Sequence, residues 1–382
     1  MSTSAIAAPV DPGPSADRTG KPPPAAPAAP AAPAPPAPPQ GVAPLLTELQ
    51  KLYQQTEEAT EAYNGTAAEL KRRTAQAKRL GAALAAARTA LSDSRDAAGR
   101  LAREQYRERS DFSGYARLLL APDPEHLMDQ EHLLRRAATW RATTVKRLAT
   151  AEKRADALAS ESRKVLDRQR ALTTRRGKQR DTVRARLGVV EAKLAKLSAA
   201  QLAELARLEQ QGTAKAQSAL AASGALSSVR PPSAAGGTAV RYAIEQLGKP
   251  YVWGAEGPDS FDCSGLTSRA WARAGLVIPR TSQEQWRQLR KVPLNALRPG
   301  DLVVYFPKAT HVALYIGNGL VVQAPRPGTR VKVSPVASNP LLGAVRPDPG
   351  GAPLADYRGP RLPDGATEGS DTGYGSSSAP GQ

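Results

Sequence analysis

The chain has 382 residues, a formal net charge of +18 and a sequence pI near 10.2, so it should be attracted to anionic polymers such as nucleic acid, a cell wall or a membrane surface. Aromatic residues make up only 4% of it, which argues against the base-stacking platforms of single-stranded nucleic-acid binders. Its single cysteine excludes an internal disulfide and a zinc site built on several thiolates, and no apolar stretch is long enough to predict a membrane-spanning helix.

Residues 1–43 are rich in proline and alanine, and the stretch "KPPPAAPAAPAAPAPPAPPQ" predicts an extended, disordered arm without a core of its own. The first residues lack a basic segment followed by an apolar one, so they do not read as an ordinary signal peptide. If the protein is exported, we expect it to use another route or another start.

Residues 44–211 predict a long all-α coiled-coil hairpin. From Leu45 to Leu101, apolar or small residues recur with the 4-3 spacing that is typical of a coiled coil. Pro122 and Pro124 then interrupt the pattern, and a second long helical stretch follows. Two long helices joined by an irregular tip favour an antiparallel hairpin, although a coiled coil between two chains fits the same pattern.

The composition changes after the hairpin. Residues 212–235 are small and predict a flexible linker. In residues 236–348, tyrosine, tryptophan, valine and isoleucine become more frequent and short strand-like runs appear, which predicts one compact domain. Residues 349–382 are rich in glycine, serine and proline and predict a disordered tail.

The only cysteine lies in "FDCSGLTSRAWARAGL", where Asp262 can cap a helix that begins at Cys263 and Gly275 can end it. A helix N-terminus favours the thiolate, so we expect the pKa of Cys263 to be lowered. The small Ser264 and Gly265 would leave room for a substrate backbone. These features favour a reactive cysteine over the simpler alternative of a small buried hydrophobic residue.

A cysteine nucleophile needs a base, and His311 is the only one of the chain's histidines in the same predicted domain. Gln323, one strand further on, is the candidate that would hold the imidazole in one tautomer. Gln323 shares a face with His311 only if the turn at Gly317–Gly319 is a three-residue loop or contains a bulge of equal effect, so that Gln323 pairs with Ala313.

Six ordered segments carry a family resemblance: "QLGKPYVWG", "FDCSGLT", "IPRTSQEQ", "LRPGDLVVY", "HVALYIGNG" and "QAPRPGTRVKV". Together they resemble the NlpC family of bacterial cell-wall cysteine peptidases. The resemblance implies an α+β papain-like domain with Cys263 as nucleophile and His311 as base. Gln323 stands at the third position, where the family often has histidine, and it would stabilise an imidazolium less than a carboxylate would.

The resemblance also implies a substrate, namely peptidoglycan stem peptides, often cut between D-glutamate and meso-diaminopimelate. It places Tyr251, Asp262, Ser264 and Arg280 in the substrate cleft. Residues 236–348 hold 14 lysines and arginines against 7 acidic residues, a balance of +7 that suits an anionic peptide.

The predicted hairpin is similar to the long hairpins of division-associated wall hydrolases. Its tip, "YARLLLAPDPEHLMDQEHLL", resembles the region that in that group engages an FtsX-type membrane protein. Because a wall peptidase must be restrained, we expect the hairpin to cover the Cys263 cleft until a partner binds the tip near residues 118–128. The alternative is a passive spacer that only sets a distance to the wall.

The sequence therefore predicts a secreted or wall-associated peptidoglycan stem-peptide endopeptidase with a Cys–His mechanism, regulated by its coiled coil. We expect no cofactor, no metal and no nucleic-acid partner. Two alternatives stay open: an inactive wall-binding scaffold, and an amidase or acyltransferase that uses the same Cys–His site.

Overall fold

The computed structural model describes residues 41–108, 124–227 and 230–367. The predicted N-terminal arm up to residue 40, the middle of the predicted hairpin tip and the last part of the predicted tail from residue 368 lie outside the described residues.

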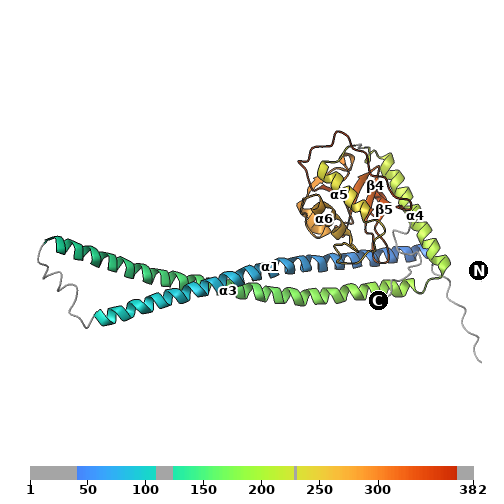
Figure 1. The fold of residues 1–382 in the computed structure, drawn as a ribbon. Helices are drawn as coiled ribbons and strands as arrows, with labels where there is room; N and C mark the ends of the chain where they lie inside the picture. The colour runs from blue at the N-terminus through green and yellow to red at the C-terminus, as the bar shows by residue number, and fades with distance from the viewer. Residues whose placement is uncertain (1–40, 109–123, 228–229, 368–382) are drawn as a thin grey trace, which may run out of the picture. The chain divides into compact units, whose positions relative to one another are not determined.

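The predicted hairpin is present as two long helices, α1 (Val42–Glu108) and α3 (Pro124–Leu194), which lie side by side (Figure 1). As the residue number rises along α1, the residue it contacts on α3 has a lower number. Glu48 contacts Lys193, Thr74 contacts Gln169, and Arg95 contacts Glu152. The two helices are therefore antiparallel and belong to one chain.

The seam between α1 and α3 follows the predicted 4-3 spacing. The buried residues at these positions are Leu49, Thr56, Ala59, Thr66, Ala87 and Leu101 on α1, and Ala155, Val165, Leu172, Val183 and Val190 on α3. Each fully buried leucine or valine contributes about 1.5–3 kcal/mol relative to an exposed one, and the many small residues let the helix backbones approach closely.

The chain departs from the prediction after α3, because the second long helical stretch does not continue unbroken to residue 211. It breaks after Leu194, and helix α4 (Ala199–Ala222) starts anew at Ser198. Ser198 accepts a hydrogen bond from the backbone N–H of Gln201, while the Gln201 side chain accepts one from the backbone of Ser198. This reciprocal cap fixes the new helix start.

Helix α4 also replaces the first half of the predicted flexible linker. Residues 212–222 are alanine-rich, and alanine has the highest helix propensity. The Gln217 side chain donates a 3.1 Å hydrogen bond to the carbonyl of Gly319 and accepts a 3.0 Å bond from the N–H of Ala337. Small residues in this segment therefore support a helix that is fastened to the domain that follows.

The C-terminal domain, residues 230–367, is α+β, as predicted. Its helices are α5 (Ala234–Glu245), α6 (Cys263–Arg273) and α7 (Ser282–Gln288). Its strands are β1 (Arg290–Val292), β2 (Leu302–Tyr305), β3 (His311–Gly317), β4 (Leu320–Gln323), β5 (Lys332–Pro335) and β6 (Leu341–Arg346). These strands form one six-stranded antiparallel sheet in the order β1-β6-β2-β3-β4-β5.

Both faces of the sheet are buried, with side chains alternating between them along each strand. One face packs against α5 and α6 through Leu302, Val304, Val312, Leu314, Val322 and Val345. The other face presents Val303, Tyr305, Ala313, Tyr315, Val321 and Ala344, and Leu220 of α4 packs against it. An uncovered second face would expose a large apolar surface, which explains why α4 lies on the domain.

The described part of the predicted tail, residues 349–367, also contacts the domain. The N–H of Leu354 donates to the carbonyl of Pro232 at 2.8 Å, and the N–H of Val333 donates to the carbonyl of Ala366 at 2.9 Å. The ordered part of the domain therefore extends beyond the predicted boundary at residue 348.

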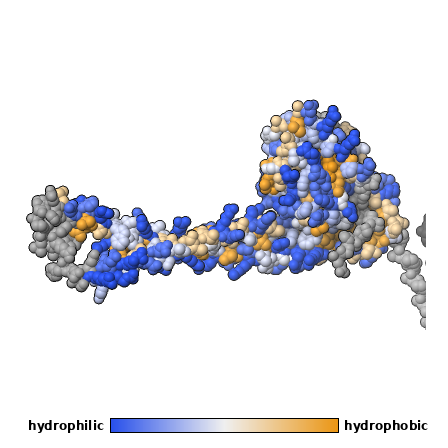
Figure 2. All heavy atoms as spheres, viewed as in Figure 1, coloured by the Kyte–Doolittle hydropathy of each residue, from blue (hydrophilic) through white to orange (hydrophobic). Residues whose placement is uncertain are grey.

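Hydrophilic residues predominate on the described surface of the helices, with smaller hydrophobic areas between them (Figure 2). Among the described helices, none combines the length and the apolar character needed to cross a membrane.

Candidate active site

Helix α6 begins at Cys263, as the sequence predicts. The Asp262 carboxylate caps it by accepting a 2.6 Å hydrogen bond from the N–H of Gly265, and Gly275 follows the helix with a φ of 86°. Cys263 is 3% exposed, so its sulfur is enclosed rather than open to solvent.

Gly265 does not leave room for a substrate, contrary to the expectation. A Cβ atom at this position would overlap the carbonyl oxygen of Ala255, whose loop packs directly on the first turn of α6. The absence of a side chain therefore serves the approach of the Ala255 backbone, which also accepts a 3.0 Å hydrogen bond from the N–H of Asp262.

His311 begins β3 and Gln323 ends β4, and both side chains are buried. Nε2 of His311 lies 2.7 Å from Oε1 of Gln323. Because an amide oxygen only accepts, Nε2 carries the hydrogen and Nδ1 of the neutral ring is left as the basic atom.

The turn between these strands meets the predicted condition. Leu314 pairs with Val322, which sets Ala313 opposite Gln323, and the register shifts between Tyr315 and Gly317. Asn318 and Gly319 have φ values of 53° and 70°, so a two-residue turn is combined with a bulge. The bulge places Gln323 on the face of His311.

The residues predicted to line a substrate cleft lie around Cys263. Arg280 contacts both oxygens of the Asp262 carboxylate, at 3.1 and 2.7 Å, and donates a 2.8 Å hydrogen bond to Oγ of Ser264. Tyr251 is buried in the same core cluster as Cys263, and its pKa is raised by burial and then by the Cys263 sulfur. The structure thus gathers these side chains near one thiol.

Helix α1 supplies charged residues to this site that the sequence analysis did not identify. Oε1 of Glu61 accepts a 2.7 Å hydrogen bond from Oγ of Ser264 and lies 3.9 Å from Sγ of Cys263. Oε2 of Glu61 accepts a 2.7 Å hydrogen bond from the N–H of Ser282, at the start of α7. Glu61 is buried, so its carboxylate fills the space beside the thiol.

Two further residues of α1 complete this contact. Oε1 of Glu57 lies 3.3 Å from Nδ1 of His311, and Nδ2 of Asn64 donates a 2.9 Å hydrogen bond to Oδ2 of Asp262. Glu57, Glu61 and Asn64 are spaced four and three residues apart, so they share one face of the helix. We call the arrangement in which these three residues contact the domain the docked arrangement.

A weak signal for this face exists in the sequence. The stretch "TEEATEAYN" concentrates acidic residues in a strongly basic chain, and Glu57 and Glu61 are one helical turn apart. Heptad analysis assigns them to a solvated face, because nothing in the spacing shows that a domain more than 200 residues away packs there. Only the fold brings the two segments together.

The docked arrangement reverses the expected effect on the cysteine. Burial raises the pKa of Cys263 well above its ordinary value, and the carboxylates of Glu61, Asp262 and Glu57 raise it further, while Arg280 opposes them. The helix N-terminus does not overcome this desolvation and negative charge. Cys263 is therefore held as a neutral thiol.

The same carboxylates act on the candidate base. Burial lowers the pKa of His311, but Glu57, the hydrogen bond that His311 donates to Gln323, and Glu61 together raise it above the ordinary value. Glu57 and Glu61 thus influence the pKa values of both Cys263 and His311. Oε1 of Glu57, 3.3 Å away, is the charged group next to Nδ1.

The acidic groups of the site lie around a cysteine and a histidine. Within the described parts of the chain, no three histidine, cysteine or acidic side chains are grouped as metal ligands would be. The nearby acidic groups are already bound to Arg280, Ser264 and backbone N–H groups.

A buried cysteine at a capped helix start, and a histidine and a glutamine on adjacent strands of an antiparallel sheet, are the candidate catalytic side chains of this α+β domain. Residues 248–343 match the NlpC/P60 family. The C-terminal part of the chain is an NlpC/P60 domain, which confirms the predicted resemblance.

Several curated proteins align with this domain. A probable endopeptidase of Corynebacterium glutamicum is 42% identical over 116 residues, which cover 30% of this chain and 56% of the relative. The peptidoglycan endopeptidase RipA of Mycolicibacterium smegmatis is 38% identical over 120 residues, covering 28% of this chain and 24% of the relative. The chain thus spans about half, or less, of the length of the curated relatives it matches.

Solved structures of this family also align. The NlpC/p60 domain of the peptidoglycan hydrolase SagA is 33% identical, with a TM-score of 0.28, and the match covers 29% of this chain and 97% of that one. RipD of Mycobacterium tuberculosis, described as a non-catalytic NlpC/p60 domain protein adapted to peptidoglycan binding, is 34% identical, with a TM-score of 0.27, covering 29% and 96%.

Proposed function

We propose that the protein is a peptidoglycan stem-peptide endopeptidase that uses Cys263 as nucleophile and His311 as general base. The observation that carries this proposal is the combination of Cys263 at the capped start of α6 with the 2.7 Å contact between His311 and Gln323. The curated relatives, named as endopeptidases and as a peptidoglycan endopeptidase, support the substrate class.

The proposed reaction is acyl transfer through a thioester. Sγ of Cys263 loses its proton to Nδ1 of His311 and attacks the peptide carbonyl carbon. The imidazolium returns that proton to the leaving amine as the C–N bond breaks. Water, deprotonated by His311, then hydrolyses the thioester and restores the thiol. Gln323 keeps Nε2 protonated throughout, so that Nδ1 remains the atom that exchanges protons.

Glu61 indicates where the substrate carboxylate would bind. Its carboxylate lies beside Cys263 and is held by Oγ of Ser264 and the N–H of Ser282, with Arg280 close enough to lower its pKa. A D-glutamyl residue of a stem peptide carries a free carboxylate next to the bond that would be cut. We propose that this carboxylate takes the same partners and that cleavage occurs at the D-glutamate–diaminopimelate bond.

We further propose that α1 restrains the enzyme. Glu61 occupies the space beside Cys263 that a substrate needs, and Glu57 lies against Nδ1 of His311, the proposed base. The thiol is held neutral, so an activated pair can form only after α1 moves away. This gives the coiled coil a regulatory role rather than that of a passive spacer.

The signal for release would come from the end of the hairpin opposite the domain. Large apolar side chains are exposed near that end of α1 and α3, namely Tyr106, Met128, Leu133 and Trp140. An FtsX-type membrane protein is our proposed partner, with the chain secreted or associated with the wall. The central part of the tip sequence lies outside the described residues, so the apolar residues beside it support this proposal.

The test uses the full chain and purified muropeptides, with products identified by mass spectrometry. A Glu57→Ala/Glu61→Ala variant, which removes both side chains of α1 from the site, should cleave between D-glutamate and diaminopimelate, and adding Cys263→Ala should abolish cleavage without unfolding the protein. If the released variant alkylates readily at Cys263 yet cuts nothing, the domain is a wall-binding scaffold. Transfer of the acyl group to an amine, or release of ammonia, would instead indicate an acyltransferase or an amidase.

A further inference from the structure

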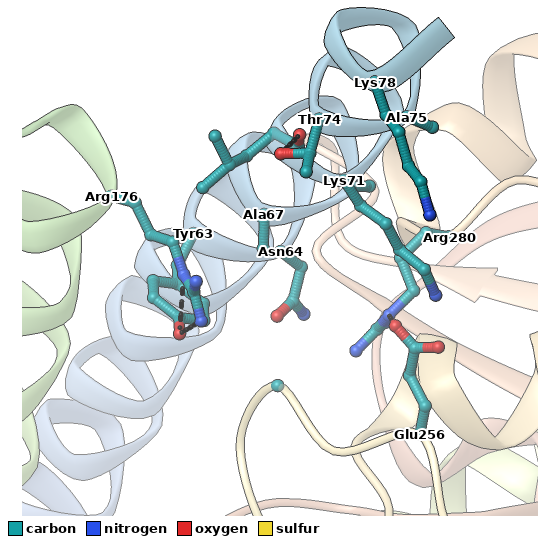
Figure 3. A pocket seen from close by; sticks show the side chains of 13 residues that line it. Tyr63, Asn64, Ala67, Lys71, Thr74, Ala75, Lys78, Arg176, Glu256 and Arg280 are labelled. Carbon is teal, nitrogen blue, oxygen red and sulfur yellow. Dashed lines mark hydrogen bonds and ion pairs between the residues drawn. The ribbon is translucent and has the colours of Figure 1, made fainter. Parts of the chain in front are cut away.

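A second cavity lies beside the docked contact and is not part of the catalytic pair. It has a volume of about 620 Å³ and is lined by α1, by Arg176 of α3 and by domain residues that include Gly254, Glu256 and Arg280 (Figure 3). Its walls come from both the hairpin and the domain, so this cavity exists only in the docked arrangement.

The charges of this cavity are mostly positive. Lys71, Lys78, Arg176 and Arg280 line it, with Glu256 as the acidic residue among the lining side chains. Glu256 is already paired with Arg280 at 2.8 Å, and Arg176 donates to the hydroxyl of Tyr63 at 2.7 Å. Within the described residues, Lys71 and Lys78 have no ion pair, so two cations are left for a ligand.

The two lysines point the same way. They are separated by seven residues of α1, which is two helical turns and about 10 Å along the axis. In Figure 3 both side chains extend from α1 toward Arg280 and Glu256. Long lysine side chains can close on two negative groups of one small molecule.

Neutral parts of the wall narrow the ligand class. Ala67, Ala68, Leu70 and Ala75 form an apolar strip of the lining, and Asn64 and Tyr63 add polar groups. A bare phosphate would not use an apolar strip, whereas a short peptide with small side chains and two carboxylates would use both kinds of surface.

We propose that this cavity binds an acidic peptide with at least two carboxylates and that the bound peptide holds α1 docked. A ligand whose site needs both the hairpin and the domain stabilises the docked arrangement by its binding free energy. The choice of peptide rests on the proposed function, because cleavage after D-glutamate would produce such a fragment. The cavity would then make the enzyme sensitive to its own product.

The experiment measures alkylation of Cys263 by iodoacetamide in the full chain, a readout that requires no hydrolysis. The probe is N-acetyl-L-alanyl-D-glutamate, which carries two carboxylates, and its uncharged diamide is the control ligand. If the peptide binds only the docked chain, the alkylation rate falls by a factor of one plus the ratio of the peptide concentration to Kd. This factor is roughly ten when the peptide concentration is ten times Kd. Ionic strength is kept constant with NaCl.

The variants separate this cavity from the catalytic cleft. Lys71→Gln/Lys78→Gln should abolish the protection, while Arg72→Gln/Arg79→Gln, which removes equal charge from neighbouring exposed positions of α1, should keep it. Protection by the diamide, equal protection in the Lys71→Gln/Lys78→Gln chain, or no protection of the wild type would overturn the proposal. A protein that alkylates as expected but cleaves no muropeptide would refute the proposed function and leave this site intact.

Discussion

The carboxylate of Glu61 accepts a 2.7 Å hydrogen bond from Ser264, the residue that directly follows Cys263, although the two partners are separated by 203 positions. The same carboxylate accepts the N–H of Ser282. One side chain of the hairpin therefore joins the first turns of α6 and α7, and whatever moves α1 must break both hydrogen bonds.

Removing this side chain should open the site. In a Glu61→Ala chain, Ser264 and the N–H of Ser282 would lose their partner beneath α1, and a lost hydrogen bond to a charged group costs roughly 1.5–3 kcal/mol. We expect Cys263 to react with iodoacetamide about tenfold faster or more. The matched control is Glu58→Ala, because Glu58 forms only an exposed ion pair with Lys308 and should change the rate less than about threefold. Equal rates in wild type and Glu61→Ala would show that α1 does not limit access.

Docking should weaken as the pH rises. Burial, and after it the neighbouring Asp262, raise the pKa of Glu61 to about 7, although Arg280 and the hydrogen bonds from Ser264 and Ser282 act in the opposite direction. Once α1 leaves the domain, the pKa returns to its ordinary value near 4.5. The docked chain therefore holds a proton that the open chain releases. The free energy of docking is most favourable below pH 4.5, the pKa of Glu61 in the open chain, and docking loses on the order of 3 kcal/mol of free energy as the pH rises through about 7, the pKa in the docked chain.

Energy transfer between two dyes checks this pH dependence. The dyes are attached at Arg79→Cys on α1 and Val277→Cys on the domain, both exposed positions, in a Cys263→Ala chain. Transfer should decrease between about pH 5 and pH 8. Glu61→Gln, which cannot titrate, should flatten the curve. An unchanged pH dependence in that variant would assign the effect to another group.

Gln323 should act on His311 rather than on the substrate. Gln323→Ala would free Nε2 of His311 to exchange tautomers, and we expect kcat to fall roughly tenfold to a hundredfold with KM nearly unchanged. Gln323→Glu would instead raise the pKa of His311 by placing a carboxylate next to Nε2. The pH profile of kcat/KM should then shift to higher pH, which a purely structural role of Gln323 would not produce.

Gly265→Ala should destabilise the domain. The new Cβ would overlap the Ala255 carbonyl, a backbone atom that cannot rotate away, and overpacking of this kind costs about 1–3 kcal/mol. Gly81→Ala is the control, because the space around Gly81 on α1 is open and alanine is the better helix former. Thermal unfolding followed by tryptophan fluorescence should show a lower Tm for Gly265→Ala only.

The sequence predicted the local features of this protein better than its long-range contacts. The caps of α6 and the antiparallel hairpin follow from residue types at short spacing, which act through backbone geometry, whereas the bulge before Gly317 is one of the two turn geometries that the sequence left open. The partners of Glu61 could not be predicted, because a solvated acidic helix face and a docked one have the same heptad pattern. The lowered pKa expected for Cys263 was wrong for the same reason, since the groups that raise it come largely from α1.

The linker region shows a different limit. Small residues in 212–222 are compatible with a flexible chain or with a helix, and the choice is made by the apolar second face of the sheet, against which Leu220 packs. No local pattern in that segment reports the existence of this face.

Gln217 fastens α4 to Gly319, in the turn between the strands that carry His311 and Gln323, and to Ala337, which follows β5. The domain is therefore attached to the helical part of the chain by a second contact that does not involve Glu61. Because of this contact, α1 remains at a high effective concentration near the domain even after it has separated from the site. Reclosure would need no search through solution. Under the proposed function, a partner that opens the site must stay bound to keep it open. Cleavage would then be confined to the time and the place of that partner's presence, and the cell would need no separate inhibitor to end it.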